Sequence, residues 1–85
     1  MELEFAQTVR EHKSTIYTVC YMFSNNPDEV ADLYQEILIN LWKDFPKFRG
    51  DSNVRTWIYR VSLNTCISSE RKNSRKVETL PLSMD

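Results

Sequence analysis

Glycine, histidine and cysteine are scarce, with one glycine, one histidine and two cysteines among the 85 residues. A glycine-rich phosphate loop cannot be built from the single Gly50. A zinc site would lack ligands, because Cys20 and Cys66 lie far apart and His12 stands alone. We therefore expect no metal and no other cofactor. Both cysteines fall in helical apolar patterns and are expected to be buried, reduced thiols; a disulfide between them is possible but has no support.

Long apolar runs are also absent. No stretch reaches the roughly 18 apolar residues of a membrane span, and the N-terminus shows no signal peptide. We expect a cytoplasmic protein without membrane insertion. With 41% apolar and 27% charged residues, the composition is typical of a globular chain. Its length suits one small domain.

Catalytic patterns are missing as well. No serine or cysteine has a histidine placed to activate it, and the chain has one histidine to share. Asp32 and Glu36 are one helical turn apart, a spacing that is usually a solvated face rather than an acid/base pair. We do not expect an enzyme.

Charge is divided along the chain. Residues 1–42 contain two basic and seven acidic side chains, whereas residues 43–76 contain nine basic and three acidic ones. A basic half favours a polyanion, and an acidic half favours a basic protein surface. The division indicates one molecule with two partners, unless two solvated faces have segregated by chance.

Apolar periodicity predicts an all-α fold, a compact bundle of three main amphipathic helices. The first is expected over about residues 2–24, with His12 on its apolar stripe as a packed, hydrogen-bonded residue. The second should begin with Asn26 as its N-cap and Pro27 in the first position. Its apolar face consists of Val30, Leu33, Tyr34, Ile37, Leu38, Leu41, Trp42 and Phe45.

A short loop over residues 46–53 is expected before the last helix. Asp51 or Ser52 should cap that helix, which is predicted to run from about Asn53 to Lys72 or slightly beyond. Its inward face consists of Val54, Trp57, Ile58, Val61, Thr65 and Cys66. We expect the domain to occupy residues 1–76, with residues 77–85 as the start of an interdomain linker or a disordered tail.

The segment from residue 45 to residue 60 interleaves basic side chains with aromatic rings. Cations that follow a phosphate backbone, beside rings on which bases stack, are typical of proteins that bind single-stranded nucleic acid. Trp57 lies on the apolar stripe and is expected to be shared between the core and a ligand. The Asn64 amide can both donate to and accept from a base edge.

Residues 31–42 resemble the polymerase-binding helix of bacterial sigma factors. Residues 48–52 and 55–64 resemble the promoter-melting part of the extracytoplasmic-function group of the sigma-70 family. The two motifs stand in the family's order and spacing, and the resemblance covers most of residues 5–76. The chain thus looks like the region 2 domain of such a factor.

The resemblance implies two binding surfaces. One helix would dock on the clamp helices of the largest subunit of core RNA polymerase, through Asp32, Gln35 and Glu36, with Asn40 and Lys43 on the same face. The other surface would recognise and melt the promoter minus-ten element in transcription initiation by capturing bases of the single-stranded non-template DNA. Its expected residues are Lys47, Phe48, Arg49, Gly50, Asp51, Ser52, Asn53, Arg55, Trp57, Tyr59, Arg60 and Asn64.

The sequence departs from the family pattern at Ser62, where alanine is frequent, and at Ser68, where aspartate is frequent. A second domain, which reads the minus-thirty-five element in the family, is not in this chain, so we expect weak DNA binding by the chain alone. The resemblance also implies an anti-sigma factor as a partner. The alternative is a helical interaction module whose aromatic-basic face binds a protein, such as an anti-sigma factor, instead of DNA. An unrelated single-stranded RNA binder would leave the acidic helix unexplained.

Overall fold

The structure is a computed structural model that describes residues 2–48 and 53–84, with side chains described as far as residue 72. Its elements are α1 (Glu2–Glu11), α2 (Lys13–Phe23), α3 (Pro27–Asp44), the short 3₁₀ helix η1 (Phe45–Lys47) and α4 (Val54–Met84). The described residues contain no strand, and the predicted all-α class is confirmed. None of these helices is long and apolar enough to cross a membrane.

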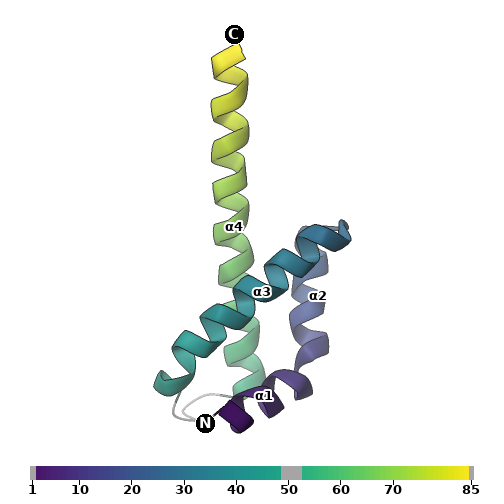
Figure 1. The fold of residues 1–85 in the computed structure, drawn as a ribbon, viewed down its shortest axis with the longest axis vertical. Coiled ribbons are helices and arrows are strands. Elements are labelled where there is room, and N and C mark those ends of the chain that lie inside the picture. Colours follow the sequence, from purple (N-terminus) through teal and green to yellow (C-terminus); the bar gives the residue numbers. More distant parts are fainter. Residues whose placement is uncertain (1, 49–52, 85) are drawn as a thin grey trace.

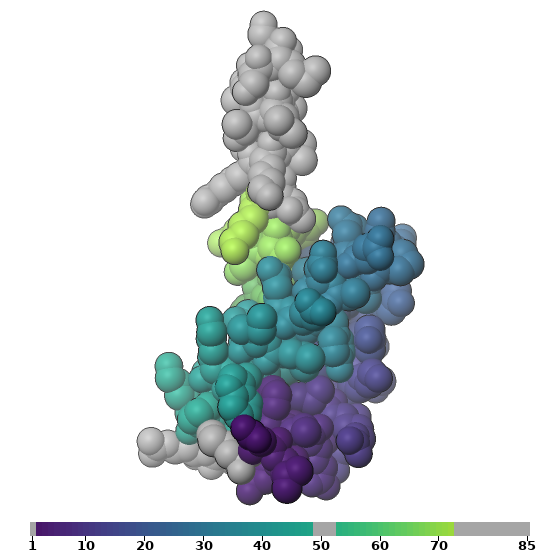
Figure 2. Space-filling model, viewed as in Figure 1, coloured from purple at the N-terminus to yellow at the C-terminus, as the bar shows by residue number. Residues whose placement is uncertain are grey.

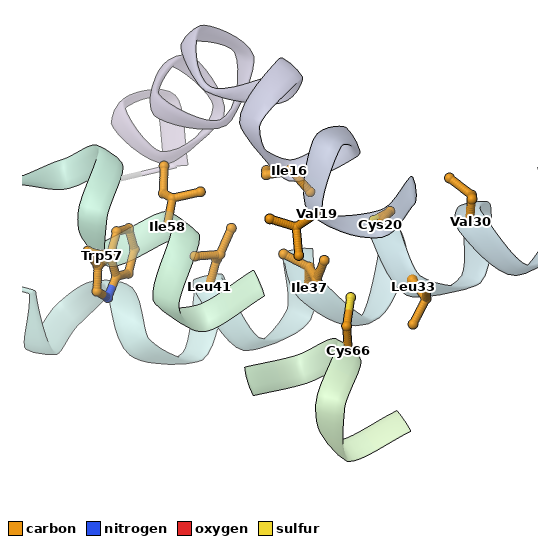
Figure 3. Packing of buried hydrophobic residues seen from close by; sticks show 10 residues of the cluster. All are labelled: Ile16, Val19, Cys20, Val30, Leu33, Ile37, Leu41, Trp57, Ile58 and Cys66. Atoms are coloured by element: carbon orange, nitrogen blue, oxygen red, sulfur yellow. The ribbon is translucent and has the colours of Figure 1, made fainter. Parts of the chain in front are cut away.

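The core lies between α2, α3 and α4, each of which packs against the other two (Figure 1). Its buried side chains come from all three helices (Figure 3). They are Ile16, Val19, Cys20, Val30, Leu33, Ile37, Leu41, Trp57, Ile58 and Cys66. Burying a side chain of this size stabilises the fold by about 1.5–3 kcal/mol relative to leaving it exposed. The count of three main helices agrees roughly with the prediction: α3 is the second predicted helix, α4 contains the third, and α2 is the C-terminal part of the first.

Both cysteines are free and buried, so the predicted reduced thiols are confirmed. Cys20 comes from α2 and Cys66 from α4. Burial, and to a smaller extent the neighbouring Cys20, raise the pKa of the Cys66 thiol from its ordinary value of 9.0 to about 12. A thiol with such a pKa stays protonated and unreactive at neutral pH.

The single helix expected over residues 2–24 is wrong, because the chain bends at His12 and forms two helices (Figure 1). At the bend His12 has φ −115° and ψ 19°, and its Nδ1 lies 3.0 Å from the Thr8 carbonyl oxygen. Because of the bend, α1 runs in a different direction from α2. Phe5 then meets the rings of Trp42 and Phe45 edge-on, with centroids 5.0 Å and 5.4 Å away. Aromatic contacts at the end of α3 therefore hold α1, which buries no residue completely.

The start of α3 is as predicted. Asn26 Oδ1 accepts the backbone N–H groups of Asp28 at 2.8 Å and Glu29 at 3.4 Å, and Pro27 takes the first helical position. Two otherwise unpaired donors are satisfied in this way. The Ser24 hydroxyl donates to the Glu29 carboxylate at 2.6 Å, which fixes the connection from α2.

The bounds of the last helix differ from those predicted. Asn53 Oδ1 accepts the Arg55 N–H at 2.8 Å, so Asn53 caps α4; the expected caps Asp51 and Ser52 lie outside the described residues. The helix also runs past the expected end near Lys72, because α4 continues to Met84. The domain boundary at residue 76 stays a prediction.

Candidate nucleic-acid interface

Most rings of the aromatic-basic segment pack against one another. Phe48 stacks on Trp57, with centroids 4.6 Å apart and planes at 22°, and Phe45 lies 6.1 Å from the same indole. Trp57 is only 5% exposed. A base cannot stack on the face that Phe48 covers. Trp57, predicted to be shared between core and ligand, is thus mainly a core residue, and Tyr59, 42% exposed, is the ring of the described segment most open to a base.

A hydrogen bond fixes the orientation of the indole. Trp57 Nε1 donates to Asp44 Oδ2 at 2.7 Å and joins the end of α3 to the first turns of α4. Sequence reasoning missed Asp44, because thirteen residues separate the two groups and no local pattern pairs them. The bond satisfies a buried N–H that would otherwise be costly to leave without a partner.

An open groove of about 410 Å³ runs between α3 and α4. Its basic side chains are Lys43 and Lys47 from the α3 side and Arg60 from α4, and its one carboxylate is that of Asp44. The groove is therefore electropositive, as a phosphate site requires. Its lining consists of Asn40, Lys43, Asp44, Lys47, Trp57, Arg60, Val61, Asn64, Thr65 and Ser68.

The groove gathers part of the predicted DNA-binding set. Lys47, Trp57, Arg60 and Asn64 line it, whereas four other predicted residues do not. Those four are Phe48, Asn53, Arg55 and Tyr59. The Asn53 side chain is already used as the cap of α4. Residues 49–52, which the resemblance assigns to the base pocket, lie outside the described residues.

The wall of the groove is held by two hydrogen bonds. Asn40 Nδ2 donates to Thr65 Oγ1 at 2.8 Å, and that hydroxyl donates to the Val61 carbonyl oxygen, also at 2.8 Å. Asn40 was predicted to contact polymerase, but its amide nitrogen donates a hydrogen bond to Thr65 of α4. A smaller hollow of about 250 Å³ adjoins the groove, sharing Asn40 and Thr65 and continuing toward Glu36.

Three of the other predicted polymerase residues lie earlier along α3, on its exposed side, whereas Lys43 lines the groove. Asp32, Gln35 and Glu36 are exposed, while their neighbour Leu33 is only 8% exposed and belongs to the core. Ile39, 53% exposed, adds an apolar side chain to the same face. Figure 2 shows α3 crossing the front of the molecule. An acidic, partly apolar surface of this kind suits a basic protein partner.

The comparison with known families decides the assignment, because a family model for Sigma-70 region 2 matches residues 8–76. The chain belongs to the sigma-70 region 2 family. The resemblance drawn from the two motifs, including the extracytoplasmic-function group, is confirmed.

Curated relatives agree with the family. The chain is 29% identical over 73 residues to the ECF RNA polymerase sigma factor SigG of Mycobacterium tuberculosis, covering 86% of this chain and 20% of the relative. It is 34% identical over 68 residues to the ECF RNA polymerase sigma factor SigW of Bacillus subtilis, covering 80% and 36%. It thus spans about a third or less of these relatives. No solved structure gives a significant match.

Two positions at which this sigma region 2 domain departs from the family pattern have different surroundings. Ser62 is fully buried, and its Oγ has no hydrogen-bond partner. Ser68 is exposed and lines the groove between α3 and α4. The list of apolar residues left Ser62 out of the predicted core because serine is polar, although Ser62 lies one helical turn from both Ile58 and Cys66 of the predicted inward face.

Proposed function

We propose that this domain binds core RNA polymerase and captures non-template bases of the promoter minus-ten element as the duplex melts during transcription initiation. The observation that carries the proposal is the gathering of basic and base-pairing side chains in one groove. Lys47, Arg60 and Asn64 line this groove, while the acidic residues Asp32 and Glu36 are exposed earlier along α3, Glu36 in the smaller hollow beside it. The SigG and SigW relatives, named as RNA polymerase sigma factors, support the same partners.

In this proposal the groove holds the backbone and the exposed side chains hold bases. Lys47 and Arg60 neutralise phosphates, and Tyr59 offers a ring on which a base stacks, worth about 1–3 kcal/mol. The Asn64 amide can pair with a base edge. These contacts offset the few kcal/mol that unstacking a base costs. Base capture by residues 49–52 remains part of the proposal, and so do cytoplasmic location and an anti-sigma partner.

The test is the strand preference of the protein assembled with core polymerase. A labelled non-template minus-ten oligonucleotide, taken from a promoter that this assembly transcribes, should bind more tightly than its template-strand and scrambled counterparts. Tyr59→Ala should weaken binding by about 5- to 150-fold, the equivalent of losing one stacked base. Asn64→Ala should reduce the preference over the scrambled strand.

Tyr21→Ala is the matched control, because Tyr21 is an exposed tyrosine on α2, away from the groove. It should leave strand affinity unchanged. Equal affinity for the two strands would refute base capture. A strand preference that survives Tyr59→Ala and Asn64→Ala together would place the bases elsewhere.

A further inference from the structure

We infer that the C-terminal end of α3 is a wall of the strand-binding groove, and that Lys43 there contacts a phosphate of the DNA strand rather than polymerase. The inference rests on the proposed function and extends it to a residue that the family resemblance places on the polymerase face. The evidence for this role of Lys43 is the set of side chains that line the groove.

The first step is the change of charge along α3. Its first turn carries Asp28 and Glu29, whereas Lys43 is the basic residue of its last turn. Lys43 follows Glu36 by seven residues, so the two lie about 10 Å apart along the helix axis. The acidic and basic parts of one helix can therefore serve different partners.

The second step is the direction in which the basic part faces. Asn40 and Lys43 line the groove together with Arg60 and Asn64 of α4. The Asn40 amide donates to Thr65 at 2.8 Å, which ties this part of α3 to α4. Asn40 is thus a positioning residue of the wall, and Lys43 lies one turn further along the same edge.

The third step is the balance of charge across the groove. Lys43 and Lys47 lie on one side and Arg60 on the other, while Asp44 directs one carboxylate oxygen to the Trp57 N–H. A volume of about 410 Å³ lies within the range of ligand sites, roughly 300–1,000 Å³. Cations on both walls of an open groove suit a phosphodiester chain that runs along it.

A simpler role for Lys43 is to stabilise the C-terminal end of α3, where a cation interacts favourably with the helix dipole. That role predicts no loss of strand affinity. The two roles are therefore separated by the salt dependence of strand binding, which counts phosphate contacts.

The experiment uses Lys43→Gln in the protein assembled with core polymerase. Strand affinity should fall about 3- to 10-fold at low salt, and the slope of log affinity against log salt should fall by about 0.7, the value for one phosphate of a single strand. Affinity for core polymerase, measured separately without DNA, should stay within twofold. Lys13→Gln, an exposed lysine on α2 outside the groove, should change neither quantity.

Two comparison variants distinguish a failure of the Lys43 inference from a failure of the proposed function. Glu36→Gln should weaken polymerase binding, and Arg60→Gln should lower the salt slope as Lys43→Gln does. An unchanged slope for Lys43→Gln, or a loss of polymerase affinity above twofold, overturns the inference. If Arg60→Gln also leaves the slope unchanged, the groove does not bind the strand and the proposed function fails with it.

Discussion

Ser62 places a hydroxyl in the core without giving it a partner. A buried polar group of this kind costs about 1–3 kcal/mol, and serine forms helix less readily than alanine. We predict that Ser62→Ala raises the free energy of unfolding by about 1 kcal/mol, measured by urea denaturation. Ser68→Ala is the matched control, since Ser68 is exposed on the same helix. A gain at Ser68 as large as that at Ser62 would mean that helix propensity, not burial, is the cause.

Single residues show where sequence reasoning succeeds and where it stops. Periodicity predicted that Trp57 faces inward, because an amphipathic stripe is a property of local sequence. It could not predict that Phe48 would cover the indole face, since that contact depends on how the chain turns between α3 and α4. The position of Ser62, one turn from Ile58 and from Cys66, is also local information, but its lack of a hydrogen-bond partner could be known only from the structure.

At the scale of elements, the bond between Asp44 and Trp57 joins α3 to α4 across the segment that links them. We predict that Asp44→Ala lowers the free energy of unfolding by about 1–3 kcal/mol, because it leaves the buried indole N–H unpaired. Asp44→Asn keeps an oxygen that can accept this bond and should cost less than half as much. Thermal or urea unfolding of the two variants measures the difference. Equal losses would show that the carboxylate acts through its charge and not through the hydrogen bond.

Some features of the helices could be predicted from the sequence and others could not. The start of α3 could be predicted because Asn26 and Pro27 are local signals. The bend at His12 could not be predicted, since the apolar stripe continues through it and the rings that Phe5 contacts across the bend are distant in the sequence. The groove could not be predicted either, because it forms only where α3 lies beside α4. There Asn40 and Lys43 of α3 line the same groove as Arg60 of α4.

At the scale of the whole molecule, the two halves of the chain have opposite charge: Asp32 and Glu36 are exposed on α3, while Lys43, Lys47 and Arg60 line the groove. The acidic side chains of α3 repel phosphate, while the groove attracts it. Three groove cations make few phosphate contacts, so the protein free in solution should hold DNA only weakly. Polymerase binding would hold the groove beside the promoter and raise the effective concentration of the strand.

This coupling gives the last prediction. Strand affinity of the free protein should fall in the range of non-specific binding, with a dissociation constant of about 10⁻⁴–10⁻⁶ M, and core polymerase should improve it at least about tenfold. Fluorescence anisotropy of the labelled minus-ten strand measures both states, with polymerase held near its dissociation constant for the unaltered protein. Glu36→Gln should remove most of the gain while leaving the free protein's affinity equal or slightly higher, because a negative charge is lost. Glu11→Gln, an exposed glutamate on α1, should keep the full gain. Binding by the free protein as tight as that by the assembly would mean that the groove works alone and the acidic face has another role.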